Sequence, residues 1–349
     1  MEMVKIEANT LFIDITNVCN FNCPFCLNGL HNEEEKHMSL DQFKMFLKKC
    51  LDYKITDVIL SGGEPLCHPQ IMQFMELINQ SSIRLRLITN GYLVSEDVLN
   101  FFISNDRHII QISLDGSDAK TSDYYRFKGG FEKNIKTVEI LRRNGFENII
   151  LRMTIAKRNY HQVKEFYDKF SKDSYISFSP VQALGTAQEN WDDLSLSNKE
   201  MACIQKQMRE IVAVNPKMAS EERNLRPIAT CPLFSEDPVI SPSINIDGDV
   251  FPCNMYHTDF VLGNIFVDDF DDIFNKNFYS ERKRIKDSIS LRLKDVCGTC
   301  ILKNQEKCTG GCPARWLYNR QRTNMMECMS KRREFFYRNH KKILFGIFS

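Results

Sequence analysis

The segment Thr10–Cys26, T-L-F-I-D-I-T-N-V-C-N-F-N-C-P-F-C, joins a strand-like run to three closely spaced cysteines. Residues 10–16 are rich in β-branched side chains and alternate in polarity, which is typical of a β-strand. Cys19, Cys23 and Cys26 can supply three thiolates to a [4Fe–4S] cube and leave the fourth iron open to a small molecule. A cluster that only carries electrons normally has four protein ligands, so the spacing indicates chemistry at the cluster. Zinc binding is the alternative for three cysteines in one loop.

Strand-like and helix-like segments alternate through the first half of the chain. Ser39 and Gln42 form a predicted capping box, which starts a helix that ends near Leu51. A second helix is predicted at Ile71–Ile78, and Asn159 is the predicted N-cap of a later one. The predicted strands are 10–16, 56–60, 84–88, 109–114, 148–155 and 175–179. Six βα units in a row predict an α/β fold, a partial (β/α)6 TIM-like barrel with a parallel sheet.

Polar or glycine-rich motifs follow several of these strands, where barrels of this kind place their functional sites. Gly62-Gly63-Glu64-Pro65 comes after the second strand. Its glycines allow a ligand to approach the backbone, and Glu64 can accept hydrogen bonds from an ammonium group. Taken alone, the motif is equally consistent with a simple turn. The other candidate residues are Thr89 and Asn90 after the third strand, Ser113 at the end of the fourth, and Arg126 and Arg152.

The CxxxCxxC spacing, with G-G-E-P at the next strand end, resembles the signature of the radical SAM superfamily. This resemblance implies that S-adenosylmethionine (SAM) chelates the open iron, and that Arg126 or Arg152 pairs with its carboxylate. For each arginine, a structural ion pair is the alternative. The stretch I-S-L-D-G, followed by D-Y-Y-R and G-G-F, resembles the branch of peptide and protein maturases. The implied SAM pocket consists of Gly62, Gly63, Glu64, Thr89, Asn90 and Ser113.

A second cysteine-rich block occupies residues 231–330. Its seven cysteines are Cys231, Cys253, Cys297, Cys300, Cys308, Cys312 and Cys328. Cys297–Cys312 alone is compatible with a zinc ribbon, but seven thiols is an awkward number for zinc. The pattern resembles the SPASM extension of radical SAM enzymes, which usually carries two auxiliary [4Fe–4S] clusters.

The resemblance also implies how these cysteines divide between the two clusters. The distal cluster would be fully ligated by Cys297, Cys300, Cys308 and Cys328. The nearer cluster would be ligated by Cys231, Cys253 and Cys312. Its fourth ligand stays open, with either an oxygen of Asp237 or the substrate in that position.

Asn254 marks a departure from the anaerobic sulfatase-maturing branch, which has an aspartate base directly after the cysteine equivalent to Cys253. An amide cannot accept a proton at neutral pH, so sulfatase maturation is disfavoured. Tyr256, His257 and Asp259 are alternative bases, with a loop role as the competing interpretation.

Composition restricts the function class further. The chain has 349 residues and a net charge of +1, so no broad positive field favours nucleic acid. It lacks an apolar run long enough to span a bilayer, and the N-terminus M-E-M-V-K-I-E is unlike a signal peptide. We therefore expect a cytoplasmic protein with no integral membrane segment. Thirteen cysteines in a reducing compartment indicate metal ligands before disulfides.

Four regions are expected along the chain. They are a radical SAM partial-barrel core at 1–185, a helix and linker at 186–230, a SPASM domain at 231–330 and a basic C-terminal helix at 331–349. No leader-binding domain fits before the first strand. A peptide substrate is therefore expected to bind the barrel directly or through a separate recognition protein.

The resemblance implies an enzyme that reductively cleaves SAM to a 5′-deoxyadenosyl radical, which abstracts hydrogen from a substrate C–H bond. Auxiliary clusters suit electron removal, so oxidation or cross-linking of a peptide or protein side chain is the leading hypothesis. The alternatives are dehydrogenation, epimerisation or decarboxylation of a small molecule such as a sugar or aminocyclitol, and a non-enzymatic electron carrier. Both enzymatic hypotheses require an external one-electron donor, flavodoxin- or ferredoxin-like.

Overall fold

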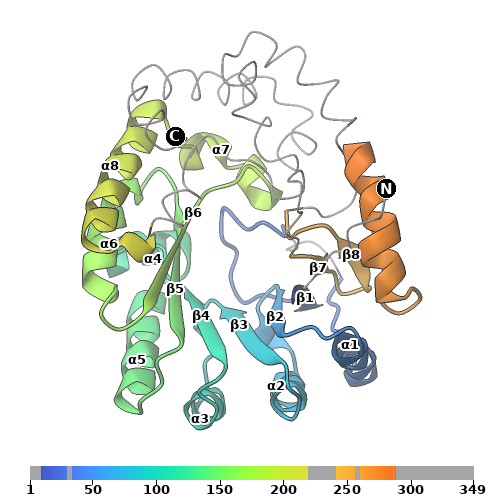
Figure 1. The fold of residues 1–349 in the computed structure, drawn as a ribbon. Helices are drawn as coiled ribbons and strands as arrows, with labels where there is room; N and C mark the ends of the chain where they lie inside the picture. The colour runs from blue at the N-terminus through green and yellow to red at the C-terminus, as the bar shows by residue number, and fades with distance from the viewer. Residues whose placement is uncertain (1–8, 30–33, 219–240, 256–259, 286, 288–349) are drawn as a thin grey trace.

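The computed structural model describes residues 9–29, 34–218, 241–255, 260–285 and 287. Within these ranges the backbone forms one nine-stranded sheet in the order β6-β5-β4-β3-β2-β1-β7-β8-β9. Figure 1 shows the sheet curving, with helices on its outer side. The strands are β1 Thr10–Thr16, β2 Asp57–Gly62, β3 Arg84–Thr89, β4 Ile109–Ser113, β5 Ile149–Ile155, β6 Tyr175–Pro180, β7 Ser243–Ile244, β8 Asp249–Phe251 and β9 Gly263–Asn264.

Strands β1 to β6 are all parallel, and each pairs with the next strand along the chain. Helices return the chain between them, which is the arrangement that βα units require. The predicted partial (β/α)6 barrel is therefore confirmed. The helices are α1 Leu40–Asp52, α2 Ile71–Asn79, α3 Glu96–Ser104, α4 Ala119–Tyr125, α5 Gly130–Arg143, α6 Val163–Phe170, α7 Trp191–Leu194 and α8 Asn198–Val214.

Short local signals start several of these helices. The predicted capping box of Ser39 and Gln42 is present at α1, and Ser197 and Glu200 form a second one at α8. The predicted cap at Asn159 is wrong, because its side chain makes no hydrogen bond to the helix that follows. A 3₁₀ turn, Tyr160–Gln162, leads into α6 there instead.

The strand side chains divide between two faces of the sheet. On β1, Leu11, Ile13 and Ile15 are fully buried in the core, whereas Phe12 and Asp14 on the inner face are half-buried. Burying each such Leu or Ile stabilises the fold by roughly 1.5–3 kcal/mol. This burial fixes β1 firmly, so the cysteine loop that follows it leaves the sheet at a defined place.

Strand β7 continues the sheet on the other edge of β1. It pairs in parallel with β1 through Phe12–Ser243 and Ile13–Ile244, and β8 and β9 then add antiparallel. The helix that contains the π-helical turn Asp272–Asn277 packs through Phe274 against Tyr53, the residue that follows α1. One hydrophobic core thus includes residues from both ends of the described chain.

The expected region limits at 185, 230 and 330 stay predictions. The C-terminal helix at 331–349 and most of the linker lie outside the described residues. In the part of the chain that is described, none of the helices combines the length and apolar character needed to cross a membrane.

Asp14 supplies a pH-dependent test of this fold. It faces the inner side of the sheet, paired in register with Ser61 of β2. Burial raises the pKa of Asp14 to about 7, against the opposing effect of a hydrogen bond with Ser61. Between about pH 4 and pH 7, the folded state therefore keeps a proton that the unfolded chain has lost. The contribution of Asp14 to the free energy of unfolding is therefore highest below about pH 4, and it falls as the pH rises from 4 to 7.

We expect the Asp14→Asn protein to gain stability relative to the wild type as the pH rises from 5 to 7.5. Above that window the difference should become constant, because the carboxyl is ionised in both states. Denaturant unfolding followed by circular dichroism over this pH range measures the difference. The same change at exposed Asp41 of α1 is the matched control. A stability difference between Asp14→Asn and the wild type that does not change with pH would contradict the raised pKa of Asp14.

Candidate metal and cofactor site

The loop after β1 carries Cys19, Cys23 and Cys26. Cys23 is buried, and the other two thiols are half-buried. The loop turns back on itself, because the Cys26 amide donates to the Cys23 carbonyl over 3.2 Å. The Phe21 amide donates to Cys19 Sγ over 3.5 Å. Hydrogen bonds to sulfur are among the means by which proteins tune cluster potentials.

The pKa values of the loop thiols determine whether these thiols must lose a proton when they bind a metal. Burial raises the pKa of Cys19 to about 12, and Glu64 and the other two loop thiols also raise it. Burial likewise raises the pKa of Cys23, against the opposing effect of the Arg126 guanidinium. Without a metal, Cys19 and Cys23 are therefore protonated at neutral pH, and cluster binding must release their protons.

The donor set fits an iron–sulfur cluster. Three sulfurs from one loop are soft ligands, which suit iron–sulfur or zinc sites. Within the described residues, no three His, Cys, Asp or Glu side chains lie close enough to hold a single metal ion. A cube takes one thiolate on each of three irons, so its ligands need not converge on one point.

Two asparagines tie the cysteine loop to neighbouring strand ends. Asn20 accepts a hydrogen bond from Asn90 Nδ2 over 2.8 Å. Asn28 donates to the Gly62 carbonyl over 2.8 Å. The sequence reasoning missed both, because an asparagine near cysteines gives no signal of what it binds.

Gly62 and Gly63 have a packing role that the sequence analysis did not predict. A Cβ at Gly62 would overlap the Thr16 carbonyl, and a Cβ at Gly63 would overlap the Val18 carbonyl. The Gly63 amide donates to the Thr16 carbonyl over 2.7 Å. The glycines thus let the start of the cysteine loop lie against β2, whereas the sequence suggested close approach by a ligand. Their predicted contact with SAM stays a prediction.

Glu64 is 1% exposed and joins two strand ends. Its carboxylate accepts hydrogen bonds from Thr89 Oγ1 over 2.6 Å, the Asn90 amide over 2.7 Å and the Leu66 amide over 3.1 Å. Burial raises the pKa of Glu64, and these three donors oppose the rise. The structure therefore brings together the predicted residues Glu64, Thr89 and Asn90, and Asn20 connects them to the cysteine loop.

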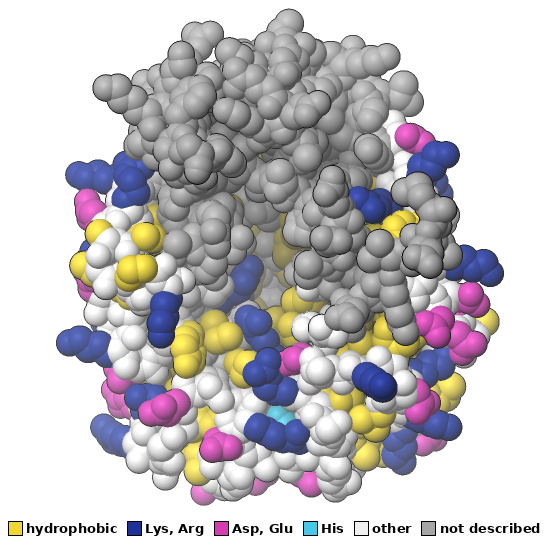
Figure 2. Space-filling view, viewed as in Figure 1, with side chains coloured by type: hydrophobic (Ala, Val, Ile, Leu, Met, Phe, Trp, Pro, Cys, Tyr) yellow, Lys and Arg dark blue, Asp and Glu magenta, His cyan; other side chains and the backbone are white. Residues whose placement is uncertain are grey.

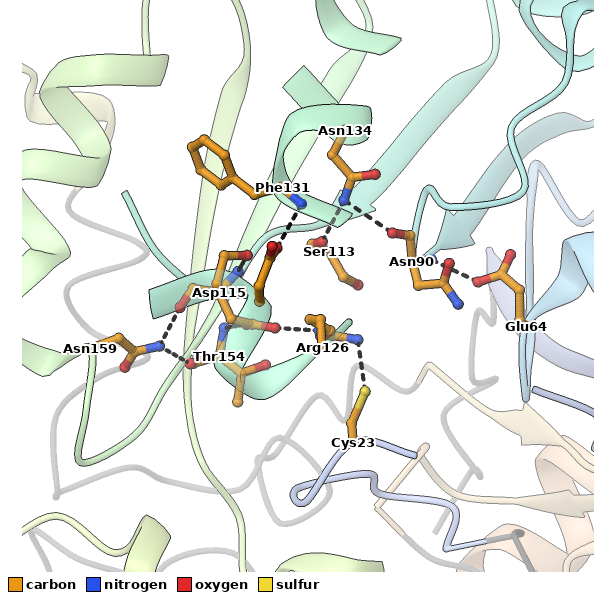
Figure 3. A network of polar contacts seen from close by, with 12 residues as sticks. Cys23, Glu64, Asn90, Ser113, Asp115, Arg126, Phe131, Asn134, Thr154 and Asn159 are labelled. Carbon is orange, nitrogen blue, oxygen red and sulfur yellow. Dashed lines mark hydrogen bonds and ion pairs between the residues drawn. The ribbon is translucent and has the colours of Figure 1, made fainter. Parts of the chain in front are cut away.

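Arg126, which directly follows α4, connects Asp115 after β4 to the same loop. Figure 3 shows its guanidinium between Asp115 and Cys23. Nε donates to Asp115 Oδ2, and Nη1 donates to Cys23 Sγ over 3.7 Å. Asp115 is fully buried, and its other oxygen accepts from the Thr154 amide over 2.6 Å. Sequence reasoning named Arg126 but missed Asp115, its partner.

Two further asparagines hold these strand ends together (Figure 3). Asn159 Nδ2 donates to the Asp115 carbonyl over 2.9 Å and to the Thr154 carbonyl over 2.8 Å. Asn134 Nδ2, from α5, donates to the Asn90 carbonyl over 3.0 Å and to the Ser113 carbonyl over 3.2 Å. Buried side-chain amides of this kind satisfy backbone groups where strands end.

The segment after β6 holds the cysteine loop from a third direction. Thr186 Oγ1 donates to the Cys23 carbonyl over 3.0 Å, and its amide donates to the Cys26 carbonyl over 3.0 Å. Asn190 Nδ2 donates to the Pro24 carbonyl over 3.3 Å. Sequence reasoning missed this contact, because the two segments are far apart along the chain.

Arg152 has a different position from Arg126. It pairs in register with Ser113 of β4 and Ser177 of β6, and its Nη1 donates to Ser177 Oγ over 3.3 Å. Arg152 thus lies on the inner face of the sheet, in one row with Ser113. Of the second cysteine block, Cys253 follows β8 and is half-buried, and the adjacent Asn254 is exposed.

The remaining predictions for the second block lie outside the described residues. They concern Cys231, Cys297, Cys300, Cys308, Cys312, Cys328, Asp237, Tyr256, His257 and Asp259.

Family comparisons agree with this arrangement. Residues 13–170 match the model of the radical SAM superfamily, and residues 238–301 match that of SPASM, an iron–sulfur cluster-binding domain. The chain therefore carries a radical SAM domain followed by a SPASM domain. Domains of these two kinds bind [4Fe–4S] clusters.

Among curated relatives, the chain is similar to the antilisterial bacteriocin subtilosin biosynthesis protein AlbA of Bacillus subtilis. The two are 25% identical over 83% of this chain and 66% of AlbA. Mycofactocin maturase MftC of Mycolicibacterium smegmatis is 23% identical over 86% of this chain and 77% of MftC. The chain thus spans about two thirds to three quarters of the length of these relatives.

Solved structures share the fold. Native anSMEcpe with bound AdoMet and Cp18Cys peptide has a TM-score of 0.69 at 19% identity, covering 97% of this chain and 98% of that one. Streptococcus suis SuiB bound to S-adenosylmethionine has a TM-score of 0.67 at 16% identity, covering 91% and 76% of the two chains.

Gly185 tests whether the segment after β6 positions the cysteine loop. Its φ is +54°, and an added Cβ would overlap the carbonyl oxygens of Cys26 and Leu27. We expect Gly185→Ala to lower iron and sulfide incorporation by the first cluster after anaerobic reconstitution. Gly130→Ala in α5, where a Cβ meets only one distant atom, is the matched control and should load normally. Equal loading of both variants would show that this contact is dispensable.

Proposed function

We propose that this protein is a radical SAM enzyme whose first cluster is held by Cys19, Cys23 and Cys26. The observation that carries the proposal is the attachment of this three-thiol loop to three segments of the barrel, through Asn90 after β3, Arg126 after α4 and Thr186 in the segment after β6. When bound, the cluster and SAM supply one-electron cleavage of SAM and a radical that abstracts hydrogen from a substrate.

The residues of the chain position and enclose this chemistry. Glu64 is held by Thr89 and Asn90, so its remaining lone pairs are directed by the strand ends and are available to an ammonium group. Arg126 and Arg152 are the cations proposed near the SAM carboxylate, with Ser113 beside Arg152. The fixed backbone around Gly62 and Gly63 leaves the pocket little freedom to rearrange, as oriented radical chemistry requires.

We propose a peptide or protein side chain as the substrate. The support comes from the relatives, which are named as a bacteriocin biosynthesis protein and a mycofactocin maturase, and from a structure of SuiB bound to precursor peptide SuiA. Oxidation or cross-linking is the proposed outcome, because SPASM clusters offer a route for the second electron. The electron that starts each turnover would come from a flavodoxin- or ferredoxin-like donor.

Oxidation also releases a proton, which some group must accept. Asn254 cannot serve, because an amide does not take up a proton at neutral pH. Tyr256, His257 and Asp259, the alternative bases named from the sequence, lie outside the described residues.

Iron counting tests the cluster assignment. Three cubes predict about twelve irons per chain after anaerobic reconstitution, and the Cys19/Cys23/Cys26→Ala variant should lose about four of them and all SAM cleavage. The matched control replaces Cys50, Cys67 and Cys203, three cysteines outside the two cluster patterns, and should keep its iron. A wild type with about four irons, or with stoichiometric zinc, would overturn the three-cluster model.

Deuterium transfer tests the substrate class. Candidate peptides encoded beside the gene, deuterated at side-chain carbons, should pass deuterium into 5′-deoxyadenosine, and mass spectrometry detects the gain. Transfer from a deuterated sugar or aminocyclitol, with none from any peptide, would replace the peptide proposal with a small-molecule one.

A further inference from the structure

We propose that Arg126 is a positioning residue that acts through Cys23 and raises the reduction potential of the SAM-binding cluster, with Asp115 holding it in place. The inference rests on the proposed cluster at Cys19, Cys23 and Cys26. It adds a role for Arg126 that is separate from any contact with SAM.

The contacts of the guanidinium define its direction. Nε donates a hydrogen bond to Asp115 Oδ2, and Nη1 donates one to Cys23 Sγ over 3.7 Å (Figure 3). The guanidinium carbon also lies 5.4 Å from the centre of the Phe25 ring, which belongs to the same cysteine loop. The cation is therefore next to the sulfur, and the carboxylate stands behind the cation.

Asp115 is fixed independently of Arg126. Its Oδ1 accepts from the Thr154 amide, its own carbonyl accepts from Asn159, and its amide donates to Ser122 Oγ over 3.3 Å. The Asp115 side chain is fully buried, and that of Arg126 is 17% exposed. An arginine held this firmly pays little conformational entropy for its contact with the thiolate.

The pair is neutral as a whole, but its two charges are at different distances from the cluster. In the reducing step, one electron passes from an external carrier or from dithionite to the cluster, with no bond made or broken and no proton moved. The cluster with its thiolates then carries one more negative charge. The cation stabilises that charge more strongly than the carboxylate destabilises it, because the cation is nearer and the Coulomb energy falls with distance. Both groups are largely buried, so solvent screens these interactions only weakly.

The experiment is a redox titration of the anaerobically reconstituted full-length protein, followed by electron paramagnetic resonance. The signal that changes when SAM is added reports the first cluster, since SAM is expected to chelate the open iron of that cluster. Arg126→Gln should shift its midpoint to more negative values. Loss of a charged hydrogen bond should lower the ratio of reduced to oxidised cluster about tenfold at a fixed potential. For a one-electron couple this corresponds to a midpoint shift of about 59 mV.

Two other variants separate a charge effect from structural damage. Asp115→Asn removes the opposing charge and should shift the midpoint to less negative values, the opposite sign. Arg158→Gln removes an exposed cation that lies over the Tyr124 ring and should leave the midpoint unchanged. Damage to the site would instead move the Arg126 and Asp115 variants the same way.

Shifts of one sign in both site variants, or an equal shift in Arg158→Gln, would overturn the inference. If Arg126→Gln does not retain its cluster, the sign of the midpoint shift in Asp115→Asn tests the inference instead. A potential that shifts as expected in a protein that cleaves no SAM would sustain this inference while the proposed function fails.

Discussion

A loop with almost no regular structure has to present three sulfurs at fixed positions, and hydrogen bonds from three separate segments of the barrel make this possible. Asn90 reaches Asn20, Arg126 reaches Cys23, and Thr186 reaches the Cys23 and Cys26 carbonyls. Each contact comes from a different part of the partial barrel, so the position of the loop depends on several βα units at once. Free backbone groups in such a loop would otherwise cost energy when buried, and here the strand ends satisfy many of them.

Two buried carboxylates organise the other strand ends in the same way. Glu64 receives donors from the residues after β3, and Asp115 receives a donor from β5 together with the Arg126 ion pair. A buried carboxylate is costly unless several donors surround it. That requirement links each strand end to its neighbour and leaves little freedom for the site to relax when its metal or SAM is removed.

Much of the fold could be predicted from local patterns, because alternation in β1 and the capping boxes at Ser39 and Ser197 depend only on nearby residues. The site could be predicted only in part. Cys23, Glu64 and Arg126 carry distinctive chemistry, but Asn20, Asp115 and Thr186 are ordinary residues whose partners lie far away in sequence. Asn159 shows the limit most clearly, since its position suggests a helix cap and its amide instead binds Asp115 and Thr154.

Strand β7 joins the SPASM region to the barrel as part of one sheet. Residues of the SPASM region supply the neighbour of β1 on its outer edge, through the Ser243 and Ile244 pairs and a hydrogen bond from the Phe12 amide to the Pro242 carbonyl. A barrel cut off before residue 241 would expose that edge to pairing with other molecules. The two domains therefore share one continuous sheet, and a fragment that contains only the barrel would lack the neighbour that covers this edge.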